Sequence, residues 1–108
     1  MILEVAALQI KDGQEKFFET DFEIAVKYIR SAKGYIRHSL NRCQEQKNKY
    51  LLLVEWIDLA AHTIGFRESS QYIEWKKLLH HYYDPSPVVE HYDPINHCRN
   101  INNNKPVT

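Results

Sequence analysis

The chain of 108 residues is poor in glycine and cysteine and carries no excess of either charge. Its three glycines are too few for a glycine-rich loop that would bind a phosphate group or a dinucleotide. Its two cysteines, Cys43 and Cys98, are too few for a disulfide framework. We therefore expect a reduced, cytoplasmic protein.

The 14 basic and 14 acidic side chains cancel, and they do not gather into runs of one sign. Without a basic patch, the sequence does not predict a nucleic-acid partner. Its apolar stretches fall short of the roughly 20 residues that cross a bilayer. The first residues lack a basic segment followed by an apolar core, so no signal peptide is expected. We therefore expect no membrane partner either.

What the chain does contain is enough apolar surface for one folded domain. Hydrophobic residues make up 44% of it and aromatic residues 12%, which argues against disorder. We predict a single domain over residues 1–95. The segment 96–108 is polar and rich in asparagine, and we predict a loose tail there.

The spacing of apolar residues predicts the secondary structure of this domain. One face of the first helix is marked by Phe18, Phe22, Ala25 and Ile29, at steps of four, three and four. Asp58 can cap a short helix, and Ser69 or Ser70 can cap the helix after it. The predicted strands are 2–10, 34–43, 50–57 and 88–95, and the predicted helices are 14–32, 58–65 and 69–83.

This order of elements, β-α-β-β-α-β, is typical of an α+β ferredoxin-like fold. In that arrangement the helices cover one face of a four-stranded sheet. The third strand, YLLLVEWI over 50–57, is apolar on both sides and so needs cover on both. A second copy of the chain is the simplest cover for the other face, and we predict a homodimer.

His62 lies in the apolar stretch LAAHTIGF and is the main candidate for acid–base chemistry. Imidazole titrates near neutral pH, so His62 could move a proton or hydrogen-bond a bound ligand. A histidine packed in the core and bonded to a backbone carbonyl would give the same pattern. The sequence leaves both readings open.

The six histidines raise the question of a metal site, which the spacing does not support. His80 and His81 are neighbours and diverge on a helix. His91, His97 and Cys98 lack the tight spacing of a zinc motif. We expect no metal site.

Large aromatic residues cluster around His62 in the sequence and are candidates for the wall of a flat pocket. Simple core packing explains them equally well. Arg37, on the second strand, could contact an anionic group of a substrate or point into solvent. The aromatic candidates are Trp56, Phe66, Tyr72, Trp75 and Tyr92.

Three pieces of sequence together resemble a known family. A strand ends in Glu-Trp at 55–56, a histidine follows at 62, and Phe-Arg-x-Ser comes at 66–69. Tyr72 and Trp75 then lie on the next helix, and VVEHY forms the closing strand. Over residues 1–95 the chain resembles the antibiotic biosynthesis monooxygenase domain, whose protomers form a dimeric α/β barrel.

The resemblance implies a homodimer in which each protomer holds a small pocket between its sheet and its helices. It further implies a cofactor-independent monooxygenase that oxidises a small electron-rich aromatic compound or quinol with dioxygen. On this reading His62 accepts or orients the proton. The substrate contacts would come from Arg37, Trp56, Phe66, Tyr72 and Trp75.

Other members of the resembled family do different chemistry, so alternatives stay open. An isomerase or an enzyme that processes small carbonyl metabolites would need the same histidine but no oxygen. A dimer that binds a small ligand without catalysis would need neither. Haem degradation is disfavoured, because the first strand reads AALQI without asparagine and the second helix offers Trp75 where a histidine would be expected.

Overall fold

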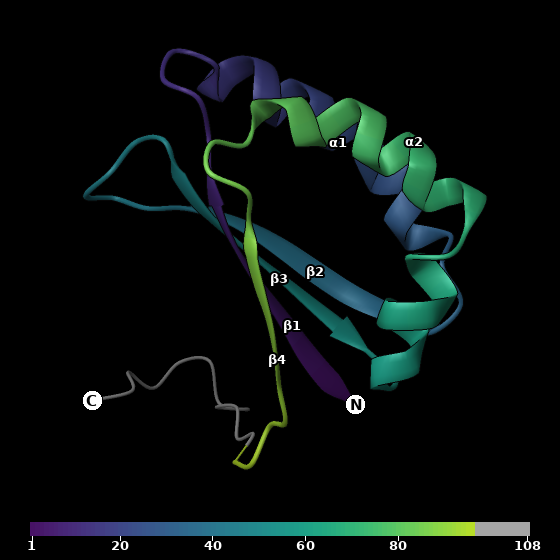
Figure 1. Ribbon diagram of the computed structural model, residues 1–108. Helices are drawn as coiled ribbons and strands as arrows, with labels where there is room; N and C mark the ends of the chain where they lie inside the picture. Colours follow the sequence, from purple (N-terminus) through teal and green to yellow (C-terminus); the bar gives the residue numbers. More distant parts are fainter. Residues whose placement is uncertain (97–108) are drawn as a thin grey trace, which may run out of the picture.

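The computed structural model describes residues 1–96, so the predicted tail lies outside the described residues except for Asn96. Four strands form one antiparallel sheet, and two helices lie together over one of its faces (Figure 1). The elements in chain order are β1 (Ile2–Gln9), α1 (Glu15–Arg30), β2 (Tyr35–Arg42), β3 (Lys49–Trp56), the π-helical segment η1 (Ala61–Phe66), α2 (Ser70–Leu79), the 3-10 turn η2 (His80–Tyr82) and β4 (Val88–Tyr92).

The strands lie in the order β2-β3-β1-β4, which is the order of a ferredoxin-like fold. The predicted fold class and element order are confirmed. The main difference is at the end of β4, which stops at Tyr92 rather than at residue 95. Asp93-Pro94 follows, and proline has no N–H with which to continue a strand pair.

The helix caps predicted from the sequence are present. Asp58 Oδ1 accepts a hydrogen bond from the Ala61 N–H at 2.8 Å, and Ser69 Oγ accepts one from the Tyr72 N–H at 3.2 Å. The helix α2 ends at Leu79, earlier than predicted, and η2 carries the chain on to Tyr82 before Asp84-Pro85. Within residues 1–96, no helix has the length and apolarity needed to cross a membrane.

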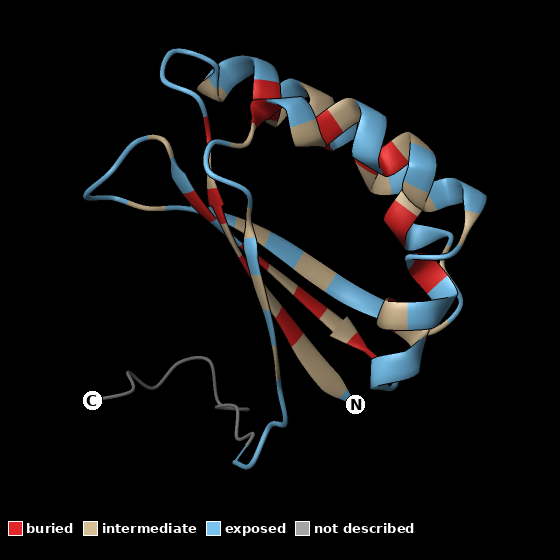
Figure 2. Cartoon of the chain, viewed as in Figure 1, coloured by how far each residue is buried: buried red, intermediate tan, exposed pale blue. Residues whose placement is uncertain are grey.

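The core lies between the helices and the inner face of the sheet (Figure 2). The four residues predicted for the inner face of α1 are all buried. From the sheet, every second residue of β3 is buried, ending in Trp56. Burial of the apolar side chains in this layer is the main force that holds the helices on the sheet.

Gly34 allows η1 to pack close to the start of β2. Its backbone φ is +92°, in the left-handed region that favours glycine. A Cβ atom at this position would lie 2.7 Å from the Cβ of Ala61 and 2.9 Å from Cγ1 of Ile57. A side chain here would therefore push away the segment that carries His62.

The helices leave the outer face of the sheet uncovered (Figure 1), and the centre of this face is apolar. Val5, Leu53 and Ala7 occupy its centre, where Val5 pairs with Leu53 across β1 and β3. Leu51 and Val88 extend it and are 39% and 62% exposed.

Candidate functional site

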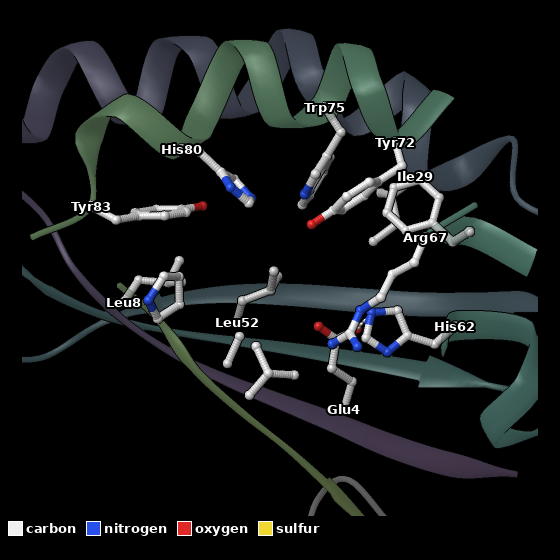
Figure 3. A pocket seen from close by; sticks show the side chains of 14 residues that line it. Glu4, Leu8, Ile29, Leu52, His62, Arg67, Tyr72, Trp75, His80 and Tyr83 are labelled. Atoms are coloured by element: carbon white, nitrogen blue, oxygen red, sulfur yellow. Dashed lines mark ion pairs between the residues drawn. The ribbon is translucent and has the colours of Figure 1, made fainter. Parts of the chain in front are cut away.

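A cavity of about 180 Å³ lies between the inner face of the sheet and the helical layer (Figure 3). We call it the His62 cavity. Its apolar wall comes from Ala6, Leu8, Leu52 and Val89 on the sheet and from Ile29, Phe66 and Trp75 on the helical side. Polar side chains reach it at both ends, so it combines an apolar interior with few polar contacts, as ligand sites commonly do.

Glu4 is a buried carboxylate in the floor of this cavity. Its even position on β1 places it on the inner face with Ala6 and Leu8, and only 6% of it is exposed. Its Oε1 accepts a hydrogen bond from the indole N–H of Trp56 at 2.9 Å. Burying a charged carboxylate costs free energy unless it has hydrogen-bond partners. The indole N–H of Trp56 is one partner of Glu4.

His62 supplies the second contact to Glu4. Its Nε2 lies 3.4 Å from Glu4 Oε1, and its ring stacks on Trp56 with centroids 5.2 Å apart and an interplanar angle of 18°. Its Nδ1 lies 2.8 Å from Nε2 of His91 on β4. Both ring nitrogens thus contact side chains, and the packing fixes the plane of the imidazole.

The π-helical form of η1 determines where His62 and Arg67 lie. The Arg67 N–H donates to the carbonyl of His62, five residues earlier, at 3.1 Å. Such wide turns are rare in proteins, and those that occur are often found at functional sites. Here the turn leaves His62 buried while the Arg67 side chain reaches the cavity beside it (Figure 3).

Burial and nearby charges set the protonation states of His62 and Glu4. Burial lowers the pKa of His62 to about 3, and the positive charge of Arg67 and the neighbouring His91 act in the same direction. His62 is therefore neutral at physiological pH. Burial also raises the pKa of Glu4 above its usual value, against the hydrogen bond from Trp56 and the charge of Arg67. A carboxylate with a raised pKa is a better proton acceptor.

The other end of the cavity carries His80 and Tyr83, with Tyr72 and Trp75 on α2 between the two ends (Figure 3). Burial raises the pKa of Tyr83 well above its usual value, and the nearby Tyr72 and Glu4 add to this. Burial likewise lowers the pKa of His80. These side chains are neutral hydrogen-bonding groups, and the cavity therefore has an acid–base end and a neutral polar end.

Comparison with known proteins identifies the family. Residues 1–78 match the family described as antibiotic biosynthesis monooxygenase. The chain belongs to the antibiotic biosynthesis monooxygenase family. The resemblance drawn from its sequence is confirmed.

The matches to individual relatives extend over most of this antibiotic biosynthesis monooxygenase domain. The uncharacterized protein YczJ of Bacillus subtilis (strain 168) is 54% identical over 95 residues, which are 88% of this chain and all of that protein. A Bordetella bronchiseptica protein, described as a proposed antibiotic biosynthesis monooxygenase, is 29% identical. Its TM-score is 0.84, over 88% of this chain and 97% of that one.

A third relative has a described activity. SnoaB from Streptomyces nogalater, a cofactor-independent oxygenase, is 17% identical and has a TM-score of 0.70. The match covers 94% of this chain and 96% of SnoaB. At this identity the likeness shows a shared fold.

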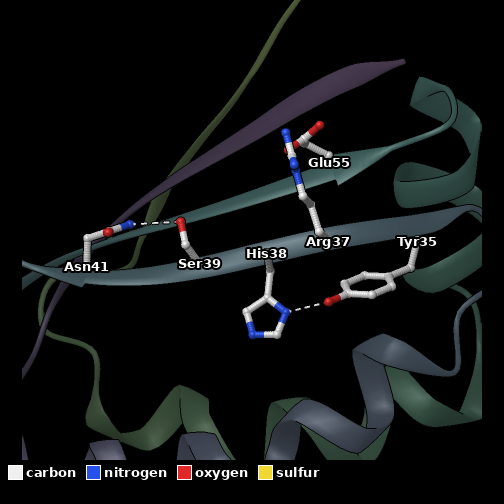
Figure 4. Close-up of polar contacts among 6 residues, drawn as sticks. All are labelled: Tyr35, Arg37, His38, Ser39, Asn41 and Glu55. Atoms are coloured by element: carbon white, nitrogen blue, oxygen red, sulfur yellow. Dashed lines mark hydrogen bonds and ion pairs between the residues drawn. The ribbon is translucent and has the colours of Figure 1, made fainter. Parts of the chain in front are cut away.

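The residues predicted for the site fall in three places in this family member. His62, Phe66, Tyr72 and Trp75 line the cavity. Trp56 lies behind His62, fully buried, and supports its ring. The third place is the outer face of the sheet, where Arg37 pairs with Glu55 (Figure 4).

Arg37 is thus not brought to the His62 cavity. Figure 4 shows it on the side of β2 opposite to Tyr35 and His38, which point toward the helices. The register shift between Tyr35 and Arg37 sets which side chains of β2 point outward. Tyr92 also points away from the cavity and is 48% exposed.

Sequence reasoning missed Glu4, Arg67, His80, Tyr83 and His91 as members or neighbours of the site. A signal for Glu4 existed, since it shares the even positions of β1 with the buried Ala6 and Leu8. His91 likewise alternates with Val89 on β4. Among residues 1–96, no group of three or more potential ligands is arranged to hold a metal ion.

Proposed function

We propose that this protein is a cofactor-independent monooxygenase that oxidises a small hydroquinone or similar electron-rich phenol with dioxygen. The observation that carries the proposal is the contact between Glu4 and His62 in the wall of a cavity with an apolar interior. The family of the chain supports the reaction class.

The reaction needs one proton acceptor and a cavity that excludes water from an electron-rich anion. Glu4, held by Trp56 and His62, takes the proton of a phenolic hydroxyl. The phenolate gives one electron to dioxygen, and the two radicals combine to form a carbon–oxygen bond and then a hydroperoxide. The hydroperoxide loses water as its ring C–H proton leaves. In sum, hydroquinone and O₂ give hydroxyquinone and H₂O.

The apolar wall serves this chemistry in two ways. It excludes water, which strengthens the electrostatic contacts at the Glu4 end. It also makes burial of a charged Glu4 costly, and this cost raises the pKa of Glu4 and its power to accept a proton. Arg67, at the same end, supplies a positive charge for the phenolate that forms.

The cavity volume favours a substrate with a single ring. An apolar cavity of roughly 150 Å³ accepts one benzene ring. The His62 cavity, at about 180 Å³, has room for one ring with a few substituents but not for three fused rings. Tyr72, His80 and Tyr83 would then contact the oxygen at the far end of the ring.

Two observations support a catalytic or ligand-binding role for His62 over simple packing. The ring nitrogens of His62 contact Glu4 and His91 rather than backbone carbonyls. The space beside His62 is a cavity and is not filled by side chains. A histidine with a purely structural role needs neither arrangement.

We also propose that the protein is a homodimer that buries the outer face of the sheet. The apolar side chains at the centre of this face, Val5, Leu53 and Ala7, support this assembly. They alternate along β1 and β3 with the buried residues that face the helices, so they point to the opposite side of the sheet. Two copies of such a face can pack against each other in an isologous contact.

Oxygen uptake by the metal-free protein tests the proposed reaction. We expect uptake with one-ring hydroquinones, less with two-ring compounds and none with three-ring compounds. The same panel run without oxygen separates the alternative, because an isomerase would turn over its substrate anaerobically. No uptake with any hydroquinone would contradict the proposal.

A further inference from the structure

We propose that His91 is the outer end of a proton path that runs from Glu4 through His62 to solvent. The proposal rests on the proposed function, in which Glu4 takes a proton inside a dry cavity. It assigns His91 as a positioning and proton-relay residue, since His91 acts through His62.

The geometry forms a continuous chain of three titratable groups. Glu4 Oε1 lies 3.4 Å from His62 Nε2, and His62 Nδ1 lies 2.8 Å from His91 Nε2. Glu4 and His91 are also direct partners across the β1–β4 pair, so the sheet itself fixes their spacing. His62, held flat against Trp56, bridges the two.

Exposure changes along this chain in the way a path to solvent requires. Glu4 and His62 are 6% and 4% exposed, and both line the cavity. His91 is only half-buried and is not among the lining residues. A proton that leaves Glu4 along this chain therefore moves away from the substrate and toward water.

The path works by tautomer exchange and needs no long-lived imidazolium. Protonated Glu4 gives its proton to Nε2 of His62, His62 passes the proton on Nδ1 to Nε2 of His91, and His91 releases the proton on its own Nδ1 to water. The reaction as a whole releases no proton, so the path runs in reverse when water forms from the hydroperoxide. No electron moves along it.

Charged groups around His62 favour this neutral route. Arg67 acts on both imidazoles from the end of η1, and it lowers the pKa of His91 as it does that of His62. The other groups that face His62 are Glu4 from β1 and Trp56 from β3. Tyr72, His80 and Tyr83 line the same cavity. Arg67 and His91 oppose a positive charge on His62, whereas the carboxylate of Glu4 can offset one.

Two variants separate proton relay from simple support of His62. The side-chain oxygen of glutamine in H91Q can still accept a hydrogen bond from His62 Nδ1–H, but glutamine cannot pass a proton on. Alanine in H91A removes the group and opens space for an added base. For both variants we expect kcat with a one-ring hydroquinone to fall about tenfold or more, with KM unchanged. Imidazole in the buffer should restore the rate of H91A in proportion to its concentration.

The matched control is H81A, which removes an exposed histidine on η2 and should keep the wild-type rate. Wild-type kcat in H91Q would overturn the relay, because hydrogen bonding alone would then suffice. A slow H91A protein that imidazole does not rescue would overturn it as well.

A second measurement needs no turnover and so separates failure of the path from failure of the proposed function. In ¹⁵N NMR of the wild-type protein, titration of His91 should shift the Nδ1 resonance of His62. Coupled resonances in a protein without oxygen uptake would refute the proposed reaction and leave the path standing. If the Nδ1 resonance of His62 does not shift while His91 titrates, the path is overturned.

Discussion

Glu4 and His91 face each other across β1 and β4, and His62 contacts both of them from η1. Three elements distant in the sequence thus build one acid–base group in the wall of the His62 cavity. The sheet register and the π-helical turn hold this group in place, so its function depends on packing as much as on the residues themselves.

Replacing Glu4 by Gln should lower the rate of oxygen uptake about a hundredfold, since general base catalysis typically contributes this much. Glutamine has the size of glutamate, and its carbonyl oxygen can still accept the Trp56 hydrogen bond, but it cannot take a proton. Steady-state oxygen consumption measures the effect. The exposed Glu74 offers the control E74Q, and equal rates for E4Q and E74Q would contradict the role of Glu4.

Replacing His62 by Gln should change how stability depends on pH. The pKa of His62 is about 3 in the folded protein and 6.5 in its ordinary state, so the unfolded chain binds the extra proton between these values. The stability contributed by neutral His62 is present above 6.5 and is lost as pH falls from 6.5 toward about 3.

Urea unfolding of wild type and H62Q at several pH values tests this. The difference in unfolding free energy between the two should shrink steadily as the pH is lowered through that window. The raised pKa of Glu4 acts with the opposite sign, but Glu4 is present in both proteins. A difference that does not vary with pH would mean that His62 is not buried in its neutral form.

The element order and the buried face of α1 were the parts of the fold that sequence patterns predicted best. Period-two and helical spacing depend on neighbouring residues alone, and they correctly gave the elements and the buried face of α1. Glu4 was not predicted as a site residue. Its contacts to Trp56 and His62 depend on pairs 52 and 58 residues apart, which no local pattern contains.

Arg37 shows a second feature that sequence patterns could not predict, the register of the sheet. Its strand was predicted, but a register shift next to it decides which side chains of β2 point outward. A shift of one residue moves a side chain to the other face of a sheet, and short sequence patterns do not reveal such shifts. For the same reason the position of His91 beside Glu4 follows only from the β1–β4 register.

Replacing Leu53 by Glu should convert the dimer into a monomer. Leu53 lies on the uncovered face at the centre of the sheet, opposite Val5. A charge buried at the proposed interface would be costly without a partner. Light scattering measures the mass. The control I73E places the same charge on α2, where Ile73 is 56% exposed, and should leave the mass unchanged. A dimeric L53E protein, or a monomeric wild type, would contradict the assembly.

Replacing Ala6 by Val should narrow the His62 cavity and raise KM for one-ring hydroquinones. Ala6 lines the cavity and is 3% exposed, so the added methyl groups must occupy substrate space. Filling a cavity does not remove buried contacts, and we expect the thermal midpoint to stay the same or rise. The matched control is A60V, at an exposed alanine that does not line the cavity. An unchanged KM in A6V would place the substrate elsewhere.

The most direct test of the central claim is the fate of the oxygen atoms. A one-ring hydroquinone is incubated with the metal-free protein under ¹⁸O₂, and the product is examined by mass spectrometry in parallel for wild type and H62A. The account predicts one ¹⁸O atom in each hydroxyquinone made by wild type, and almost no product from a folded H62A protein. A plain quinone without label, or a labelled product formed equally well by H62A, would contradict it.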